Sequence, residues 1–367
     1  MVRRLKVGVI GTGLIAQVMH LHFLRELNDC YEIVALCDVS LESARQCAEE
    51  YGVKAVHSDW REMLKEPLDA VLVLTSGSHA PIAIEAAKSG RHVFVEKPMC
   101  FSAVEGQAMV AATQDAGVIL MVGYPKRYDP AFIRFREECD RLANPKLLRV
   151  TTCESPFEPY VRTYPLSPPG AVDPIVLRGL QAETHERLCI AIGTSDQFYV
   201  TQYHAVLLDT LVHEINTVRG VIGTEPDRLD YVDLRSGSLT ALLTFGETAV
   251  AIHWLDLPGI TRYVMEFALY ADGGRLTLSF PSPFLRNAPT LLAVEGGKVG
   301  SVESWRREEV TSYESAFKRE LEVFYDAVIS GVAPPTDGTD GSRDIALCQA
   351  IIRCARTRAS VEQPTRL

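Results

Sequence analysis

The sequence predicts an α/β protein in which a doubly wound parallel sheet is followed by a second α/β domain with a mostly antiparallel sheet. Strand and helix patterns alternate over residues 5–122, as they do in consecutive βαβ units. Several strands in this part are apolar along their whole length, which is typical of strands covered by helices on both faces. After Gly123 the alternation ends, and short apolar runs separated by turn residues indicate antiparallel strands.

The first part divides into strands and helices in strict alternation. Predicted strands cover residues 5–10, 32–38, 69–74, 91–95 and 118–122, and predicted helices cover 14–27, 41–51, 79–89 and 102–116. Residues 69–74 are almost wholly apolar, and Gly90 is a stop signal for the helix before it. Ligands of such sheets bind at the carboxyl ends of the strands.

The second part has a different pattern. Predicted helices cover residues 130–142, 205–222, 313–330 and 342–357, and predicted strands cover 147–153 and several short runs between 229 and 278. The proline-rich stretch 155–170 is expected to be an irregular loop. We therefore predict one domain over residues 1–124 and another over 125–367, with the last helix either in the second domain or packed back on the first.

Composition excludes several classes of function. The chain has 367 residues, enough for two domains, and a net charge of -10 that disfavours nucleic-acid binding. It has no run of roughly 18 apolar residues that could span a membrane, and no room for a signal peptide before the first strand. Its nine cysteines form no CxxC pair. We therefore predict reduced thiols in a cytoplasmic protein without membrane or nucleic-acid partners.

A glycine turn joins the first strand to the first helix and predicts a dinucleotide site. Gly11 permits the tight turn, and Gly13 lets the backbone approach a pyrophosphate. Leu14 and Ile15 begin the helix, whose free N–H groups and positive dipole end attract the anion. Ala16 is small enough for close packing of helix and strand. The alternative is a structural turn in some other α/β protein.

Asp38 at the end of the second strand predicts which nucleotide binds. An acid at this position accepts hydrogen bonds from the adenosine ribose and repels a 2′-phosphate, which favours NAD over NADP. Asp38 could instead be a helix N-cap, although Ser40 could also fill that role. Arg45, one helical turn beyond, could accept a phosphate and leaves NADP open.

Residues Glu96-Lys97-Pro98 end a buried strand, where the ligand crevice is expected. A lysine at this edge can hydrogen-bond a substrate oxygen, and partial desolvation could lower its pKa. A structural Glu–Lys pair is the alternative.

Several ordered motifs together resemble the Gfo/Idh/MocA oxidoreductases. They are the turn at 11–16, Thr75-Ser-Gly-Ser-His79-Ala-Pro81, Glu96-Lys97-Pro98, Gly123-Tyr124-Pro-Lys-Arg127-Tyr-Asp-Pro130, and Asp209-x3-His213. The resemblance is dense over residues 1–135 and 205–225. It implies a Rossmann domain for NAD, or NADP, followed by a substrate-binding and oligomerisation domain with a large open sheet.

The resemblance also implies roles for particular residues. Lys97 contacts the reacting oxygen, His213 is the acid or base, and Asp209 assists substrate binding or orientation. Cofactor contacts are implied for Thr75, His79 and Glu96, and for Lys97 as well. Arg127 is implied to lie near the cofactor or the substrate. Tyr124 and His204 are candidates for substrate binding, although His204 could equally lie at the surface or behind the site.

The chemistry of the motif residues supports this assignment. Hydride transfer from an alcohol needs a base for the hydroxyl proton and a cation beside the developing alkoxide. Histidine and lysine supply these functions. Asp209 and His213 are four residues apart and share one face of a helix, with apolar neighbours that disfavour a solvated Asp–His pair.

The chain also departs from the family. Many family members have a glycine pair shortly before the motif's Asp and another glycine between its Asp and His. This chain has Tyr203-His204-Ala205 and Leu211 there, so the substrate of a better-known member cannot be assumed. The segment from about 155 to 200 is longer than expected, and it is predicted to be either a lid over a large or anionic substrate or a subunit contact. No His/Asp/Glu set has the sequence spacing of metal ligands, so no metal is predicted.

We therefore predict an NAD(P)-dependent oxidoreductase that acts on a secondary alcohol or ketone carbon of a sugar, amino sugar or cyclitol. One alternative is an NAD-binding sensor without turnover. Another is an epimerase or eliminase that keeps its NAD bound without net redox change. Because open antiparallel sheets often pair, a homodimer or homotetramer is expected.

Overall fold

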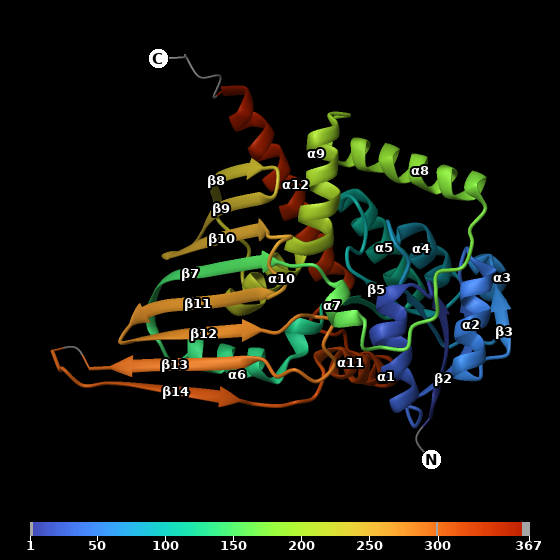
Figure 1. The fold of residues 1–367 in the computed structure, drawn as a ribbon, viewed down its shortest axis with the longest axis horizontal. Helices are drawn as coiled ribbons and strands as arrows, with labels where there is room; N and C mark the ends of the chain where they lie inside the picture. The colour runs from blue at the N-terminus through green and yellow to red at the C-terminus, as the bar shows by residue number, and fades with distance from the viewer. Residues whose placement is uncertain (1–2, 299, 362–367) are drawn as a thin grey trace. The chain divides into compact units, whose positions relative to one another are not determined.

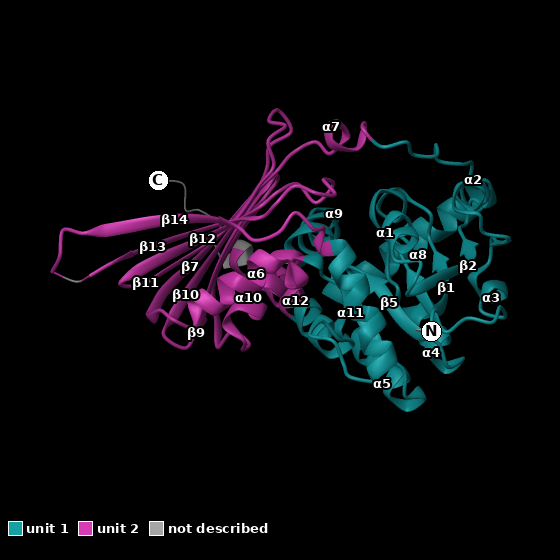
Figure 2. Ribbon diagram, turned by 90° about the horizontal axis from the view of Figure 1, so that it is seen from below, with its two compact units in different colours: residues 1–125, 164–212, 317–346 teal, residues 126–163, 213–316, 347–367 magenta. Residues whose placement is uncertain are grey.

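The computed structural model describes residues 3–298 and 300–361. The chain forms two compact units (Figure 2). Unit 1 contains residues 1–125, 164–212 and 317–346, and unit 2 contains residues 126–163, 213–316 and 347–367. The predicted division into residues 1–124 and 125–367 stays a prediction.

A parallel sheet forms the centre of unit 1 (Figure 1). Its described strands are β1 (Leu5–Ile10), β2 (Tyr31–Cys37), β3 (Ala55–His57), β4 (Ala70–Val73), β5 (His92–Glu96) and β6 (Leu120–Gly123). Their order is β3-β2-β1-β4-β5-β6, and every described pairing in this sheet is parallel. This order is that of a doubly wound sheet, so the predicted fold class is confirmed.

Helices connect these strands, and local sequence determines where they start and stop. The first helices are η1 (Ala16–His20), α1 (Leu21–Glu26), α2 (Leu41–Tyr51), α3 (Trp60–Met63), α4 (Ala80–Lys88) and α5 (Ala103–Ala116). Ser40 caps α2 by accepting a hydrogen bond from Ser43 N, and Ser102 caps α5 in the same way through Glu105 N. Both helices end at a glycine in the left-handed conformation, as their sequences indicate.

Some elements differ from their predictions. The unpredicted elements include the short strand β3 and the helices α3, α7 (Glu158–Val161) and α8 (Pro174–Ile192). Helix α7 lies within the stretch 155–170, which was expected to be an irregular loop. Asp173 caps α8 and Pro174 occupies its first turn, but only Leu188 and Ile192 are buried. The helix therefore lacks the apolar stripe on which sequence-based assignment depends.

The predicted helix 205–222 begins earlier than expected. It is preceded by α9 (Gln197–Thr201) and includes the π-helical turns of η3 (Gln202–Leu211) before α10 (Val212–Ile222). Such widened turns occur frequently at functional sites. Two further helices, α11 (Ala316–Ser330) and α12 (Gly338–Val361), confirm the predicted closing pair with shifted ends.

Unit 2 is built on a larger sheet in the order β14-β13-β12-β11-β7-β10-β9-β8. Its described strands are β7 (Ala143–Glu154), β8 (Arg228–Arg235), β9 (Ser238–Phe245), β10 (Thr248–Asp256), β11 (Val264–Asp272), β12 (Gly274–Phe280), β13 (Leu291–Gly297) and β14 (Ser304–Val310). Among the described strands of this larger sheet, only β7 and β10 pair in parallel, and the other described pairings are antiparallel. The predicted large, mostly antiparallel sheet is therefore confirmed.

Helices α6 (Pro130–Cys139) and α10 lie on one face of this sheet (Figure 2). Glu214 of α10 accepts a hydrogen bond from Thr152 of β7 at 2.6 Å, and both residues are buried. Along β10, the buried residues Thr248, Val250, Ile252 and Trp254 alternate with more exposed ones. This period of two is the pattern of a sheet that packs on helices with one face only.

The described helices include none that is both long and apolar enough to cross a lipid bilayer. All nine cysteines are free thiols in the structure, as the scattered spacing predicts.

Candidate functional site

The turn after β1 has the shape that a dinucleotide site requires. Gly11 has a φ of +96°, and a Cβ there would come within 2.7 Å of the carbonyl carbon of Leu74. Glycine is therefore required both by the backbone conformation and by the close approach of the backbone that follows β4. A Cβ on Gly13 would meet no atom within 4 Å, so the start of the following helix faces open space. This geometry fits a pyrophosphate bound to the first N–H groups of the helix.

The two glycines are predicted to respond differently to alanine. Gly13→Ala should fold like the wild type but bind NADH about tenfold more weakly, a loss of about 1.4 kcal/mol, because the added methyl group fills the space for the pyrophosphate. Gly11→Ala should lower the unfolding temperature as well. Fluorescence titration with NADH and thermal unfolding of both variants measure these effects. Wild-type NADH affinity in Gly13→Ala would contradict the assignment.

Asp38 lies beside this turn at the end of β2. Its Oδ2 accepts hydrogen bonds from Thr12 N at 2.8 Å and Thr12 Oγ1 at 3.1 Å, and its Oδ1 accepts one from Ser40 N at 2.9 Å. Ser40, not Asp38, is the N-cap of α2. Asp38 thus ties the glycine turn to the start of α2, at the position where a ribose acceptor is expected.

Lys97 and Asp209 meet within unit 1, although 112 residues separate them. Lys97 Nζ donates to the backbone oxygen of Asp209 at 2.5 Å and to its Oδ1 at 3.1 Å. The Lys97 side chain is 19% exposed to solvent, and the Asp209 side chain is 67% exposed. The ammonium group is thus held at the carboxyl end of β5. The carboxylate faces solvent, so the expectation that apolar neighbours shield the Asp209–His213 pair is wrong for Asp209.

His213 follows Asp209 by four residues, at the start of α10, and is half-buried. The division between the two units falls between Val212 and His213. The joint action of Lys97 and His213 on one substrate therefore stays a proposal.

Glu96 is buried beneath Lys97 and is paired with a histidine that sequence analysis did not select. His20 Nε2 donates to Glu96 Oε1 at 2.6 Å, and the backbone N–H of Lys97 donates to Glu96 Oε2 at 3.0 Å. Burial by itself raises the pKa of Glu96, but the hydrogen bond and charge of His20, together with Lys97, outweigh burial and lower the pKa below its ordinary value. Glu96 is therefore held as a carboxylate.

Glu320 of α11 adds a third buried member to this group. One potential metal-binding atom each of His20, Glu96 and Glu320 lies within 4.8 Å of the others. Sequence spacing could not reveal this set, because its members come from η1, β5 and α11. His20 and Glu96 hydrogen-bond each other directly, and no metal role is assigned to the three residues.

His79 supports the loop after β4. Its side chain is fully buried, and its Nε2 donates to the backbone oxygen of Thr75 at 2.7 Å. Burial lowers the pKa of His79, which keeps the imidazole neutral near pH 7. The structure thus shows His79 holding Thr75, whereas direct cofactor contacts by either residue stay predictions.

The two candidate substrate residues have different surroundings. Tyr124 is buried just after β6. His204 is half-buried in η3, and its ring packs edge-on against Phe101 with centroids 5.8 Å apart. Burial lowers the pKa of His204, although the charge of Asp209 opposes this effect. Their roles toward a substrate stay proposals.

Arg127 lies in unit 2 and contacts α10. Its Nη1 donates to the backbone oxygen and Oδ1 of Asn216, at 3.4 Å and 3.3 Å. A Cβ on Gly220 would come within 2.4 Å of Arg127 Nε, so this glycine leaves room for the guanidinium group. In this structure Arg127 bonds the protein itself, and a contact with cofactor or substrate stays a prediction.

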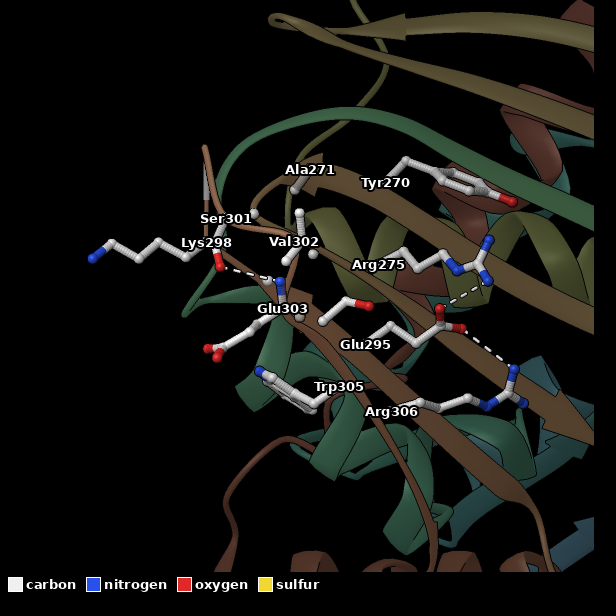
Figure 3. A pocket seen from close by; sticks show the side chains of 15 residues that line it. Tyr270, Ala271, Arg275, Glu295, Lys298, Ser301, Val302, Glu303, Trp305 and Arg306 are labelled. Carbon is white, nitrogen blue, oxygen red and sulfur yellow. Dashed lines mark hydrogen bonds and ion pairs between the residues drawn. The ribbon is translucent and has the colours of Figure 1, made fainter.

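A separate groove of about 680 Å³ lies in unit 2, at the ends of strands β11 to β14 (Figure 3). Glu295 lies between Arg275 and Arg306 there, with ion-pair distances of 2.8 Å and 3.4 Å. None of the predicted site residues lines this groove. Exposed pairs of this kind are ordinary surface features of a sheet, so the groove is not assigned to catalysis.

Comparisons with known proteins agree with this geometry. The family model described as an oxidoreductase family with an NAD-binding Rossmann fold matches residues 5–124. The chain is 25% identical to a myo-inositol 2-dehydrogenase of Thermotoga maritima, over 98% of both chains. It is 38% identical to a D-apiose dehydrogenase of Paraburkholderia graminis over 35% of each chain.

A solved structure shares the overall fold. A 3-ketoreductase from Actinomadura kijaniata in complex with NADP superposes with a TM-score of 0.72 at 19% identity. The alignment covers 96% of this chain and 98% of that one. The family match supports NAD(P) as the cofactor, and the solved structure supports the fold of both parts of the chain.

Proposed function

We propose that this chain, a member of the Gfo/Idh/MocA family of NAD(P)-dependent oxidoreductases, transfers hydride between nicotinamide and a secondary alcohol or ketone carbon of a sugar, amino sugar or cyclitol. The observation that carries this proposal is the contact of Lys97 with Asp209 at the carboxyl end of β5. This edge of a doubly wound sheet is where cofactor and substrate meet.

The residues of unit 1 supply the binding functions. Gly11, Gly13, Leu14 and Ile15 would hold the pyrophosphate, and Asp38 the adenosine ribose. Thr75 and Glu96 would lie beside the nicotinamide ribose, with His79 behind Thr75. When bound, the cofactor supplies the carbon that accepts or donates the hydride.

Proton transfer is assigned to the charged groups near β5 and α10. Lys97 would hold the reacting oxygen and stabilise its developing negative charge, because an ammonium group there is oriented before reaction begins. His213 would take the hydroxyl proton during oxidation and return it during reduction. Asp209 would orient Lys97, Tyr124 and His204 would contact the substrate, and Arg127 the cofactor or substrate.

The named relatives limit the substrate class without fixing the substrate. A myo-inositol 2-dehydrogenase and a D-apiose dehydrogenase both act on polyhydroxylated molecules, as their names state. Tyr203 and Leu211 are fully buried bulky residues near the Asp-x3-His motif, at positions where many family members have glycine. We therefore expect a pocket whose shape differs from that of the inositol dehydrogenases.

The direct test is nicotinamide absorbance during incubation with NAD and a panel of cyclitols, free sugars, amino sugars and nucleotide-linked sugars. We expect NADH and a ketone product to form in equal amounts with at least one of them. Isomerised product without net NADH formation would favour the epimerase or eliminase instead. Ligand binding without any product would favour the sensor.

The assembly and compartment are also proposals. The partly exposed face of the large sheet supports a homodimer or homotetramer, which sedimentation velocity measures directly. The nine free thiols support a cytoplasmic location.

A further inference from the structure

A segment of unit 1 crosses the adenosine end of the predicted dinucleotide site. We call residues 164–173 the strap. In Figure 1 this light-green segment passes α1 and α2 on its way to α8. Its backbone donates to side chains of η1 and α2: Ser167 N to Gln17 Oε1 at 2.8 Å, Gly170 N to Ser43 Oγ at 2.8 Å, and Ala171 N to Glu42 Oε2 at 3.3 Å.

These contacts lie on both sides of Asp38. Gln17 also donates through Nε2 to the backbone oxygen of Thr12 at 2.9 Å, and Thr12 in turn donates to Asp38. On the other side, Glu42 and Ser43 belong to the first turn of α2, which begins three residues after Asp38. The strap therefore joins the two elements between which an adenosine ribose binds.

The approach at Gly170 is especially close. A Cβ there would lie 2.4 Å from Ser40 Oγ and 2.9 Å from both Glu42 Cβ and Ser43 N. Only a glycine lets the strap touch the start of α2. A 2′-phosphate of NADP would extend from the ribose toward these same residues, because they follow the acid at the end of β2.

We infer that the strap is the outer wall of the adenosine-ribose subsite and that Gly170 and Glu42 select NAD against NADP. This inference rests on the proposed function and restricts its cofactor from NAD(P) to NAD. The strap backbone fills the space beside Ser40. The carboxylates of Asp38 and Glu42 repel the negative charge of a phosphate group, while the ribose 2′-hydroxyl of NAD has a carboxylate as its hydrogen-bond acceptor.

The test measures binding of NADH and NADPH by fluorescence titration, without any sugar. The wild type should bind NADH roughly a hundredfold more tightly than NADPH. Gly170→Val forces the strap away from α2, so this preference should fall about tenfold. Gly179→Ala is the matched control, because a Cβ there meets no atom within 4 Å, and it should keep the wild-type preference.

A second variant removes charge without removing the contact. Glu42→Gln keeps an oxygen that can accept from Ala171 N, so the strap should stay in place while NADPH binds more tightly. This variant also gives a result if Gly170→Val fails to fold. Equal affinity of the wild type for the two cofactors would overturn the inference, and so would a preference that neither variant changes.

The result is separable from the proposed catalytic function. NADH binding with the expected preference but no oxidation of any sugar would reject the proposed function alone. Turnover with equal use of both cofactors would reject the strap inference alone. If Arg45→Ala abolished tight NADPH binding, the exposed arginine of α2 would be identified as a phosphate ligand, and the inference would be overturned.

Discussion

Replacement of Lys97 by alanine is expected to lower kcat by about 10²- to 10³-fold while NADH still binds. The ammonium group is held by two oxygens of Asp209, at 2.5 Å and 3.1 Å, and therefore has a fixed position before a substrate arrives. Alanine removes the positive charge that would stabilise the reacting oxygen. Because the glycine turn and Asp38 would hold the dinucleotide without Lys97, the dissociation constant of NADH should change little.

Two further variants separate the contribution of the Lys97 positive charge to kcat from the contribution of its position. Lys97→Arg keeps the charge but changes its shape, and is expected to restore only part of the activity. Asp209→Asn keeps an oxygen acceptor and should reduce kcat less than Lys97→Ala, since the backbone oxygen of residue 209 still accepts from Lys97. Steady-state kinetics on the best substrate of the panel and NADH titrations measure both. Undiminished kcat in Lys97→Ala would refute the assignment.

The parallel sheet and the position of its site could be predicted because both leave local signals in the sequence. Strands β1, β4 and β5 are buried along most of their length and therefore read as continuous apolar runs. Gly11 has a positive φ and closely approaches the backbone of Leu74, which only glycine permits at this turn. Asp38 and Lys97 follow strand ends, and topology alone brings such residues to one edge.

Other features had no local signal. Helix α8 is mostly exposed, and its sequence lacks apolar periodicity. Strand β14 lies at the edge of its sheet and is also mostly exposed, so its sequence is polar and lacks the apolar alternation of a buried strand. The strap contacts depend on Gly170 meeting Ser40, a pairing that no spacing indicates. His20 lies among apolar residues of the first helix, and only the fold shows that it reaches Glu96, 76 residues away.

The pairing of His20 with Glu96 leads to the largest expected effect on stability. His20→Ala should lower the free energy of unfolding by about 3–5 kcal/mol, because it leaves the buried carboxylate of Glu96 without the hydrogen bond from His20. His22→Ala is a matched control from α1, the helix that directly follows η1. Its ion pair with Glu26, at 3.0 Å, is partly exposed, and its loss should cost about 1 kcal/mol or less.

A double variant distinguishes two causes of this loss of stability: the unpaired buried carboxylate and the lost packing of the His20 ring. His20 also packs edge-on against Phe94 and Phe317, with ring centroids 5.4 Å and 5.8 Å away, so alanine creates a cavity as well. Glu96→Gln removes the negative charge. If the unpaired carboxylate dominates, His20→Ala combined with Glu96→Gln should be more stable than His20→Ala alone. Simple addition of the two losses would instead assign the effect to packing.

The pH dependence gives an independent measure of the same pair. Because the pKa of Glu96 is lower in the folded state than its ordinary value of 4.5, this carboxylate contributes stability at higher pH. That contribution should decline as the pH falls below about 4.5 and through the folded-state pKa, since the unfolded chain binds the proton first. Denaturant unfolding at several pH values in this range gives the free energy of unfolding as a function of pH. This free energy should change less steeply with pH in Glu96→Gln than in the wild type. The same pH dependence in both proteins would mean that the folded structure does not lower the pKa of Glu96. The assignment of Glu96 as a carboxylate stabilised by His20 would then be rejected.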